Sequence, residues 1–239
     1  MIQVTRSGTE FSGSAEALAA LRAQFEGEHY FRLPKLLEPG LLEVIQREIE
    51  RGEFHERIHE RIGPNKELCM SGSTGFGALL FLINDEKLFR VIEDVAQCAR
   101  IRCFEGRVYR VNSGPEYHDS WHNDIGEDRL VGMSINLSTE DYQGGVLQIR
   151  DHDSREIISE VPNTGVGDAI VFRLARSLQH RITEVAGDAS KTAFAGWFRA
   201  QPDVSSLFKE FYQQPAGTEL QQMSFPVRPE ASISSKDVH

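Results

Sequence analysis

Cysteine is scarce in this sequence, and its spacing excludes a disulfide framework. The 239 residues hold three cysteines, Cys69, Cys98 and Cys103. An odd number without the paired spacing of a zinc site fits reduced thiols, so we expect buried, inert cysteines in a cytoplasmic protein. The first thirty residues also lack the basic-then-apolar pattern of a secretion signal.

Long apolar runs and clusters of basic residues are also missing. No apolar run is long enough to span a bilayer, so we expect no membrane partner. The chain carries 26 Lys and Arg against 36 Asp and Glu, a formal charge of −10, and no stripe of basic and aromatic residues offsets this. Such a charge repels a phosphate backbone, which argues against nucleic acid as a partner.

Helical spacing of apolar residues is present in the N-terminal part of the chain. It occurs after Ser14, which can cap a helix, after Pro39-Gly40 and after Asn84-Asp85. The apolar positions are Leu18, Leu21 and Phe25, then Leu41, Ile45 and Ile49, then Leu88, Ile92 and Val95. We expect three amphipathic helices that pack on a larger structure.

From about residue 100 the pattern changes to that of strands. Short β-rich runs are separated by Gly, Asp, Asn and Ser clusters, which is typical of an antiparallel sandwich or barrel. The runs are 101–112, 130–138, 145–150, 156–161, 168–174, 179–185 and 191–200. We therefore expect a mainly β fold with N-terminal helices, as one structural domain. Its parts would be a helical and mixed elaboration over 1–99, a β core over 100–213 and a polar tail over 214–239.

A candidate metal-binding pair occurs in "WHNDIGE", Trp121 to Glu127. Residues i and i+2 of a strand point to the same side, so His122 and Asp124 could offer a nitrogen and an oxygen to one ion. The chain has eight histidines, so a chance His-x-Asp in an ordinary polar loop is the alternative.

The second half of the candidate site lies in the last two β-rich runs. His180 begins "HRITEV" and Lys191 begins "KTAFAGWF". If these runs are adjacent antiparallel strands that turn at Gly187-Asp188, Lys191 lies beside His180. Two histidines and one carboxylate suit Fe(II) with three open positions. A 2-oxo acid would take two of them and dioxygen the third, and the far carboxylate of the acid needs a cation such as Lys191.

Five segments in this order resemble the 2-oxoglutarate/Fe(II)-dependent dioxygenase superfamily, especially its prolyl-hydroxylase-like and related hydroxylase branches. The segments are "HND" at 122–124, "GGVLQI" at 144–149, "GDAIVF" at 167–172, "HRITEV" at 180–185 and "KTAFAGWF" at 191–198. The resemblance implies a double-stranded β-helix, also called a jelly roll and similar to the cupins. It makes His122, Asp124 and His180 the iron ligands and Lys191 the partner of the distal carboxylate of 2-oxoglutarate.

Further candidates for cosubstrate contacts come from the strand patterns. Ser134 and Asn136 lie on the small polar face of 130–138, and Tyr109 lies on the strand before the first ligand. The alternative for each is a polar group satisfied within the core or its rim. An entrance could be lined by a further set of charged and aromatic residues, whose alternative is surface charge or core packing. These residues are Arg110, Arg129, Arg150, Trp121 and Trp197.

Three other polar features are interpreted as surface structure with no role in the candidate site. His118 fits a surface loop, because Gly114-Pro115 argues against a helix there, and His152 fits a charged turn. "HERIHER", from His55 to Arg61, fits an exposed charged strand or helix face.

The function expected from the resemblance is hydroxylation or desaturation of a small molecule, with decarboxylation of 2-oxoglutarate to succinate. Fe(II), 2-oxoglutarate and O2 are the expected cofactors. Hydroxylation of a prolyl or other residue in a peptide is one alternative. A non-catalytic jelly-roll metal-binding protein and a zinc hydrolase that uses the same ligands are others. The sequence leaves open whether the chain forms a homodimer.

Overall fold

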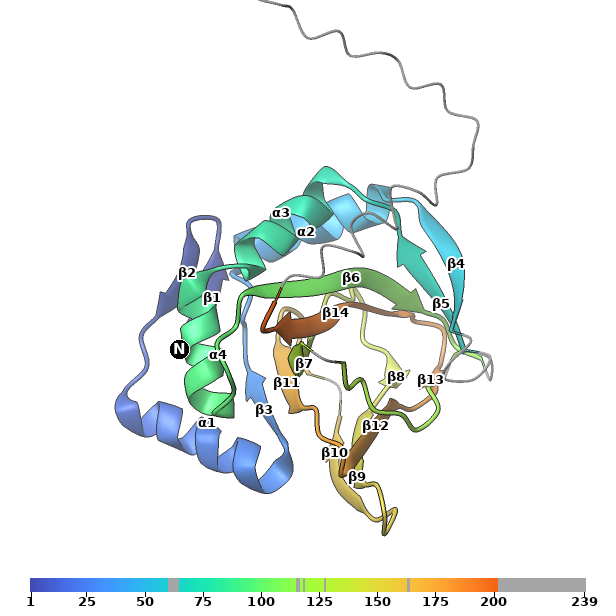
Figure 1. Ribbon diagram of the computed structural model, residues 1–239. Coiled ribbons are helices and arrows are strands. Elements are labelled where there is room, and N and C mark those ends of the chain that lie inside the picture. Colours follow the sequence, from blue (N-terminus) through green and yellow to red (C-terminus); the bar gives the residue numbers. More distant parts are fainter. Residues whose placement is uncertain (60–64, 115–116, 118, 127, 163, 202–239) are drawn as a thin grey trace, which may run out of the picture. The chain divides into compact units, whose positions relative to one another are not determined.

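The computed structural model describes residues 1–59, 65–114, 117, 119–126, 128–162 and 164–201, and every element below belongs to that part of the chain (Figure 1). The helices are α1 (Ala15–Glu28), α2 (Pro39–Arg51), α3 (Thr74–Ile83) and α4 (Glu86–Ala96). His118, the end of "HERIHER" and the expected tail over 214–239 lie outside the described residues.

The strands after residue 100 follow the expected β-rich runs closely, and five further strands lie before residue 100 in the described part of the chain. In chain order they are β1 (Ile2–Thr5), β2 (Gly8–Phe11), β3 (Tyr30–Leu33), β4 (Phe54–His59), β5 (Asn65–Met70), β6 (Cys103–Val111), β7 (Arg129–Asn136), β8 (Gln143–Gly144), β9 (Leu147–Asp151), β10 (Ile157–Val161), β11 (Ala169–Arg173), β12 (Leu178–Ile182), β13 (Val185–Ala186) and β14 (Lys191–Arg199).

The three expected helices are present and begin at side-chain caps where the sequence offers them. The Ser14 hydroxyl accepts a hydrogen bond from the backbone N–H of Ala17 at 3.3 Å, and Asp85 accepts one from Lys87 at 2.7 Å. These caps satisfy backbone donors that a helix leaves unpaired in its first turn. Helix α3 was not predicted, because "TGFGALLFLI" is apolar on nearly every side and so lacks an amphipathic period.

Two antiparallel sheets form the jelly roll. The larger sheet has the strand order β3-β11-β7-β14-β6-β5-β4, and the smaller has the order β10-β9-β12. The short β8–β13 pair continues the β9–β12 ladder. Because β3, β4 and β5 hydrogen-bond into the larger sheet, the N-terminal residues supply part of the sheet itself as well as the helices that pack on it.

The expectation that the runs beginning at His180 and Lys191 are adjacent antiparallel strands is wrong. β12, which carries His180, pairs with β9 in the smaller sheet, whereas β14, which Lys191 opens, pairs with β6 and β7 in the larger one. The turn at Gly187, where φ is +82°, therefore belongs to a crossover between sheets. His180 and Lys191 reach one cavity from opposite walls.

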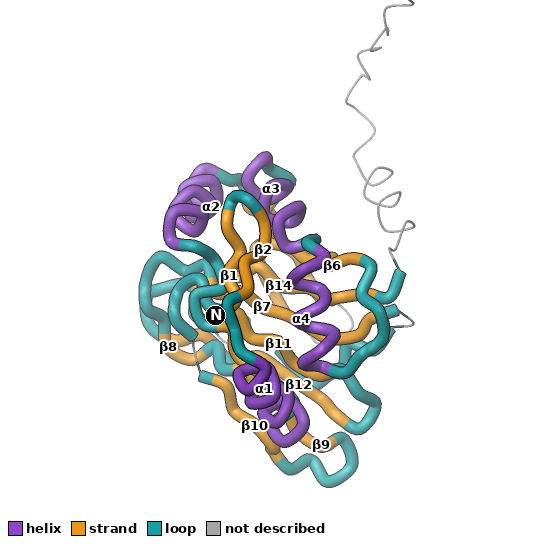
Figure 2. The backbone as a smooth tube through the Cα atoms, turned by 90° about the vertical axis from the view of Figure 1, so that its left-hand side faces the viewer, coloured by secondary structure: helices purple, strands orange, loops and turns teal. Residues whose placement is uncertain are grey.

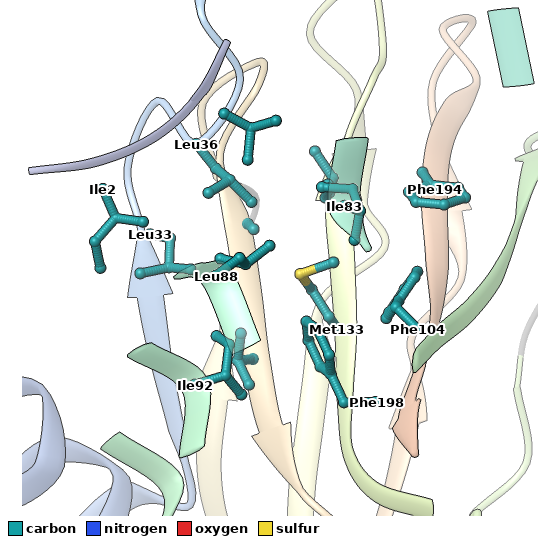
Figure 3. Close-up of a cluster of buried hydrophobic side chains, with 14 of the residues drawn as sticks. Ile2, Leu33, Leu36, Ile83, Leu88, Ile92, Phe104, Met133, Phe194 and Phe198 are labelled. Atoms are coloured by element: carbon teal, nitrogen blue, oxygen red, sulfur yellow. The ribbon is translucent and has the colours of Figure 1, made fainter. Parts of the chain in front are cut away.

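The main core lies between the helices and one face of the larger sheet (Figures 1 and 2). Figure 3 shows Leu88 and Ile92 from α4 facing the strands that carry Met133 and Phe198. The Phe104 ring lies 5.4 Å from that of Phe194 and 4.9 Å from that of Phe198, within the usual range for aromatic packing. This layer covers one face of the larger sheet, and the other face is available for the site.

A smaller apolar cluster closes part of the space between the two sheets. It consists of Leu147, Ile149, Val161, Ile170, Phe172 and Leu178. Polar side chains line the rest of that interior, and such a region between two sheets is a suitable place for a site.

Cys69 is buried, as expected, whereas Cys98 and Cys103 are only partly buried. Cys69, Cys98 and Cys103 are free, and burial raises the pKa of Cys98 to about 11. Within the described residues, none of the helices combines the length and the apolar character that crossing a membrane would require.

Candidate active site

The segment that carries His122 lies along the free edge of β12. The backbone N–H of His122 donates to the His180 carbonyl at 3.1 Å, and the His180 N–H donates back at 2.8 Å. Asp119 N–H donates to the Ile182 carbonyl at 3.1 Å. This backbone pairing fixes the two histidines opposite each other, with ring centroids 4.5 Å apart.

Trp121 secures the same segment from the outer face of the smaller sheet. The Arg150 guanidinium lies 4.2 Å from the Trp121 ring centroid and the Arg181 guanidinium lies 4.5 Å from it. Each contact is a cation–π interaction of about 0.5–1 kcal/mol where it is exposed. Trp121 and Arg150 therefore do not line the entrance as expected, because alternation along the strands turns them away from the cavity.

His122, Asp124 and His180 converge on one point. Their ligand atoms all lie within 4.8 Å of one another. The Nε2 atom of His122 is 3.9 Å from Asp124 Oδ1, and that of His180 is 3.4 Å from Asp124 Oδ2.

The hydrogen bonding of His122 suits a metal ligand. Its Nδ1 lies 2.7 Å from the Ser120 carbonyl oxygen. A carbonyl only accepts, so Nδ1 is the donor in this hydrogen bond and Nε2 is the ring nitrogen left for a metal. Two imidazole nitrogens and one carboxylate oxygen are the donor set of mononuclear Fe(II) sites with open positions, so these residues fit Fe(II).

Asp124 is held by two residues of the larger sheet. The Trp197 indole N–H donates to Asp124 Oδ2 at 3.0 Å, and Arg129 Nη1 donates to the Asp124 backbone carbonyl at 3.1 Å. The Arg129 guanidinium also stacks 3.5 Å from the Trp197 ring centroid. Burial opposes the charged carboxylate, but the interactions with His180, His122 and Trp197 outweigh it and hold the pKa of Asp124 well below its usual value.

Lys191 lies buried on the opposite wall. It is 6% exposed, and its ammonium group donates to the Gly145 carbonyl at 3.0 Å. Burial lowers the pKa of Lys191 to about 8, although the charge of Asp119 opposes that shift. Gly145 has φ +59°, and a Cβ there would lie 3.1 Å from Lys191 Cδ, so glycine permits both the turn and the close approach.

A cavity of about 560 Å³ joins the His–Asp–His cluster to Lys191. Ala193 and Ala195 follow Lys191 along its wall, and Tyr109 and Ser134 also line it. Burial raises the pKa of Tyr109, so its hydroxyl stays protonated and can donate.

Asn136 lines the cavity as well, but its amide is already engaged by the backbone. Its Nδ2 donates to the Thr164 carbonyl at 2.8 Å, and its Oδ1 accepts from the Ser138 N–H at 3.0 Å. These bonds suit a residue that shapes the wall. They leave it a weaker candidate for a cosubstrate contact than Tyr109 or Ser134.

The structure adds wall residues that the sequence did not indicate. They are Tyr142, Asp119 and three residues of β4, β5 and β6, namely Arg57, Glu67 and Arg107. The sequence could have indicated Asp119, because it stands three residues before His122. It could not indicate Arg57 and Glu67, because β4 and β5 lie far in sequence from the three candidate metal ligands.

The expected entrance set divides into two groups. Arg129 and Trp197 line the cavity, as expected. Arg110 lies on the other face of β6, with its guanidinium 4.5 Å from the Phe54 ring centroid and its Nε donating to Thr192 Oγ1 at 3.1 Å.

Comparisons with known proteins point to one superfamily. Residues 106–199 match the family model described as the 2OG-Fe(II) oxygenase superfamily. No curated protein matches the chain.

Solved structures of low sequence identity share the fold. A Pseudomonas putida prolyl-4-hydroxylase is similar with a TM-score of 0.58 and 19% identity, over 77% of this chain and 100% of that one. A 2OG-Fe(II) oxygenase family oxidoreductase from Burkholderia pseudomallei gives 0.60 and 14%, over 84% and 97%. The α-ketoglutarate-dependent epimerase SnoN from nogalamycin biosynthesis gives 0.58 and 14%, over 93% and 97%.

The matched segment contains the whole His–Asp–His cluster and Lys191, and the jelly roll is that of the similar structures. Over residues 106–199 the chain matches the 2OG-Fe(II) oxygenase superfamily, and this match, the fold and the donor set together indicate an enzyme that uses Fe(II), 2-oxoglutarate and O2.

Proposed function

We propose that the chain hydroxylates a small molecule and that His122, Asp124 and His180 hold its Fe(II). The observation that carries this proposal is the placement of a three-ligand cluster and a buried lysine on opposite walls of one cavity. The reaction consumes 2-oxoglutarate, O2 and a substrate C–H group and yields succinate, CO2 and the alcohol. Bound Fe(II) and 2-oxoglutarate supply the oxidising chemistry, and the protein supplies orientation and exclusion of water.

Lys191 would bind the distal carboxylate of 2-oxoglutarate. A buried ammonium is a point charge with three donors, so it pairs well with one carboxylate oxygen. The second oxygen then needs a hydroxyl, which Tyr109 can provide because it lies on the same face of the neighbouring strand, opposite Ala193. The methyl side chains of Ala193 and Ala195 leave room for the carbon chain of the cosubstrate.

Asp124 favours hydroxylation, or desaturation by the same hydrogen abstraction, over halogenation. In related halogenases a small residue at this position leaves room for chloride, and a carboxylate fills that space. The hydrogen bond from Trp197 fixes the carboxylate in place.

A small substrate is favoured by the size of the cavity. About 560 Å³ lies within the range of ordinary small-molecule sites, and 2-oxoglutarate would use part of it. A prolyl or other residue of a peptide is the second candidate, because the similar Pseudomonas putida structure is named a prolyl-4-hydroxylase.

The test is succinate formation from 2-oxoglutarate with purified protein and Fe(II). We expect Asp124→Ala to abolish it, and Lys191→Ala to raise the KM for 2-oxoglutarate far more than it weakens iron binding. An unchanged KM would assign the carboxylate to another residue. Activity that survives the removal of oxygen would favour a hydrolase with the same ligands, and absence of turnover with tight metal binding would favour a non-catalytic protein.

A further inference from the structure

Arg129, the first residue of β7, makes three contacts around the carboxylate of the candidate metal site. Its Nη1 donates to the Asp124 backbone carbonyl at 3.1 Å and lies 3.6 Å from Asp124 Oδ1. Its guanidinium lies 3.5 Å from the ring centroid of Trp197, whose indole N–H donates to Asp124 Oδ2 at 3.0 Å. Arg129, Trp197 and Asp124 therefore form a closed triangle in which each residue contacts the other two.

The aliphatic part of the Arg129 side chain packs against the turn that follows Asp124. A Cβ built on Gly126 would lie 3.4 Å from Arg129 Cδ and 3.6 Å from its Cγ and Nε. These are ordinary van der Waals distances, so the turn lies along the arginine side chain. The backbone N–H of Arg129 also donates to the Gly126 carbonyl at 3.3 Å. The side chain is 29% exposed, which fits a group held between this turn and the indole.

The stack of Arg129 on Trp197 is the shortest arginine–aromatic contact within the described residues. The other contacts of this kind measure 4.2 to 6.0 Å from the guanidinium to the ring centroid, against 3.5 Å here. A guanidinium this close to the ring face restrains the indole, because a rotation of the ring would open the stack. The indole N–H therefore stays directed at Asp124 Oδ2.

The arginine affects a bound metal in two opposing ways. Its positive charge beside Asp124 Oδ1 competes with a metal ion for the carboxylate, but an ion pair that is partly exposed changes binding at most about fivefold. Its packing orients the carboxylate, and loss of a partner that orients a metal ligand costs about 10- to 100-fold in affinity. Orientation therefore outweighs charge.

We propose that Arg129 is a positioning residue of the metal centre, which holds the Trp197 indole and the Asp124 main chain so that the carboxylate faces the two histidines. This inference rests on the proposed function, because it takes Asp124 as a metal ligand. It adds that metal affinity depends on the planar shape of the Arg129 side chain more than on its charge.

The first experiment titrates Ni(II) into the full chain and follows binding by calorimetry. Arg129→Met keeps an aliphatic side chain but removes the planar group, the charge and the hydrogen bond, and we expect it to weaken Ni(II) binding about tenfold. Arg129→Lys keeps the charge and a donor for the Asp124 carbonyl, but it has no planar group to stack on the indole. We expect its affinity to remain at least about threefold below that of the unchanged protein.

A double-mutant cycle tests whether Arg129 acts through Trp197. Trp197→Phe removes the indole donor and leaves a ring. Because the effects of residues in one network do not add, we expect Arg129→Met to weaken Ni(II) binding less than about threefold in the Trp197→Phe background. The same loss in both backgrounds would mean that the arginine does not act through the indole, which contradicts the inference.

Bound Co(II) gives a readout that a general loss of stability would not change. Its visible absorption depends on the number and arrangement of its ligands, so Arg129→Met should alter the spectrum at saturating Co(II). Arg110→Met is the matched control, since it removes a contact of the same kind, 4.5 Å from the Phe54 ring centroid, at a residue that does not line the cavity. It should bind Ni(II) within about twofold of the unchanged protein and keep the Co(II) spectrum.

Equal or tighter Ni(II) binding by Arg129→Met would overturn the inference, and so would full recovery of affinity by Arg129→Lys. If Arg129→Met does not fold, the affinity and the Co(II) spectrum of Arg129→Lys decide the question. If the unchanged protein binds no Ni(II), the proposed function fails together with this inference. If it binds Ni(II) and the Arg129 variants bind it equally well with an unchanged Co(II) spectrum, only the inference about Arg129 fails.

Discussion

The indole N–H of Trp197 is the most direct protein contact to the carboxylate of the candidate metal site. Trp197→Phe would remove the hydrogen bond to Asp124 Oδ2 and keep a ring for Arg129 to stack on. Loss of a partner that orients a ligand costs about 10- to 100-fold in metal affinity, so we expect a loss in that range. Anaerobic Fe(II) titration measures it. Equal affinity in the variant would mean that Asp124 is held without Trp197.

Lys191 should make 2-oxoglutarate binding sensitive to pH. The charged ammonium binds the carboxylate, and its pKa in the free protein is lowered to about 8. Because the proton is lost as the pH rises through that value, affinity should be full below about pH 7 and should fall by up to about tenfold per unit above pH 8. The dissociation constant of 2-oxoglutarate, measured on the Ni(II)-loaded protein, reports this.

Lys191→Arg provides the comparison, since an arginine stays charged throughout this range. If the variant binds 2-oxoglutarate, its affinity should be flat from pH 7 to 9.5. A flat profile for the unchanged protein would show that Lys191 is not the group that binds the carboxylate.

At the level of elements, β14 and β6 depend on a glycine at their contact. A Cβ on Gly196 would lie 1.9 Å from the Glu105 carbonyl oxygen and 2.4 Å from Gly106 Cα. Since backbone atoms cannot move aside cheaply, Gly196→Ala should lower the free energy of unfolding by about 2–4 kcal/mol. Urea denaturation would measure the change.

Gly27 offers the opposite expectation in helix α1. A Cβ there would meet nothing within 4 Å, and alanine is favoured over glycine inside a helix by about 0.5–1 kcal/mol. Gly27→Ala should therefore raise the free energy of unfolding. Equal effects of the two substitutions would contradict the packing described for β14.

The elements also show which parts of the fold could be predicted from the sequence. The helices with an apolar residue every three or four positions, such as α2 and α4, were predicted, and so were the strands of the core. α3 was missed because its apolar residues face all sides, and β12 and β14 were wrongly paired because neighbours in sequence often lie in opposite sheets of a jelly roll.

The cluster of His122, Asp124 and His180 could be proposed from the sequence, since spacing and segment order are visible there. The wall formed by Arg57, Glu67 and Arg107 could not, because it depends on β4 and β5 joining the sheet at its far edge.

For the whole molecule, metal and cosubstrate should stabilise the fold. The two histidines belong to the smaller sheet and its edge segment, and Lys191 belongs to the larger sheet, so ligands between them bind only when both sheets are formed. A ligand at about 100 times its dissociation constant contributes about 2.7 kcal/mol, which for a chain of this size corresponds to a Tm increase of about 5–10 °C.

Differential scanning calorimetry with and without Ni(II) and 2-oxoglutarate would test this expectation. Asp124→Ala should keep its own Tm when the ligands are added. A Tm increase of equal size in that variant would place the stabilising metal elsewhere in the chain.

The most direct measurement of the central claim is an anaerobic titration of Fe(II) and 2-oxoglutarate into the protein, followed by visible absorption. The unchanged protein should show the absorption band of a chelated 2-oxo acid with one iron per chain, and His180→Ala and Asp124→Ala should each remove it. Absence of the band in the unchanged protein, or its full retention in either variant, would contradict the assignment of these side chains as the iron site.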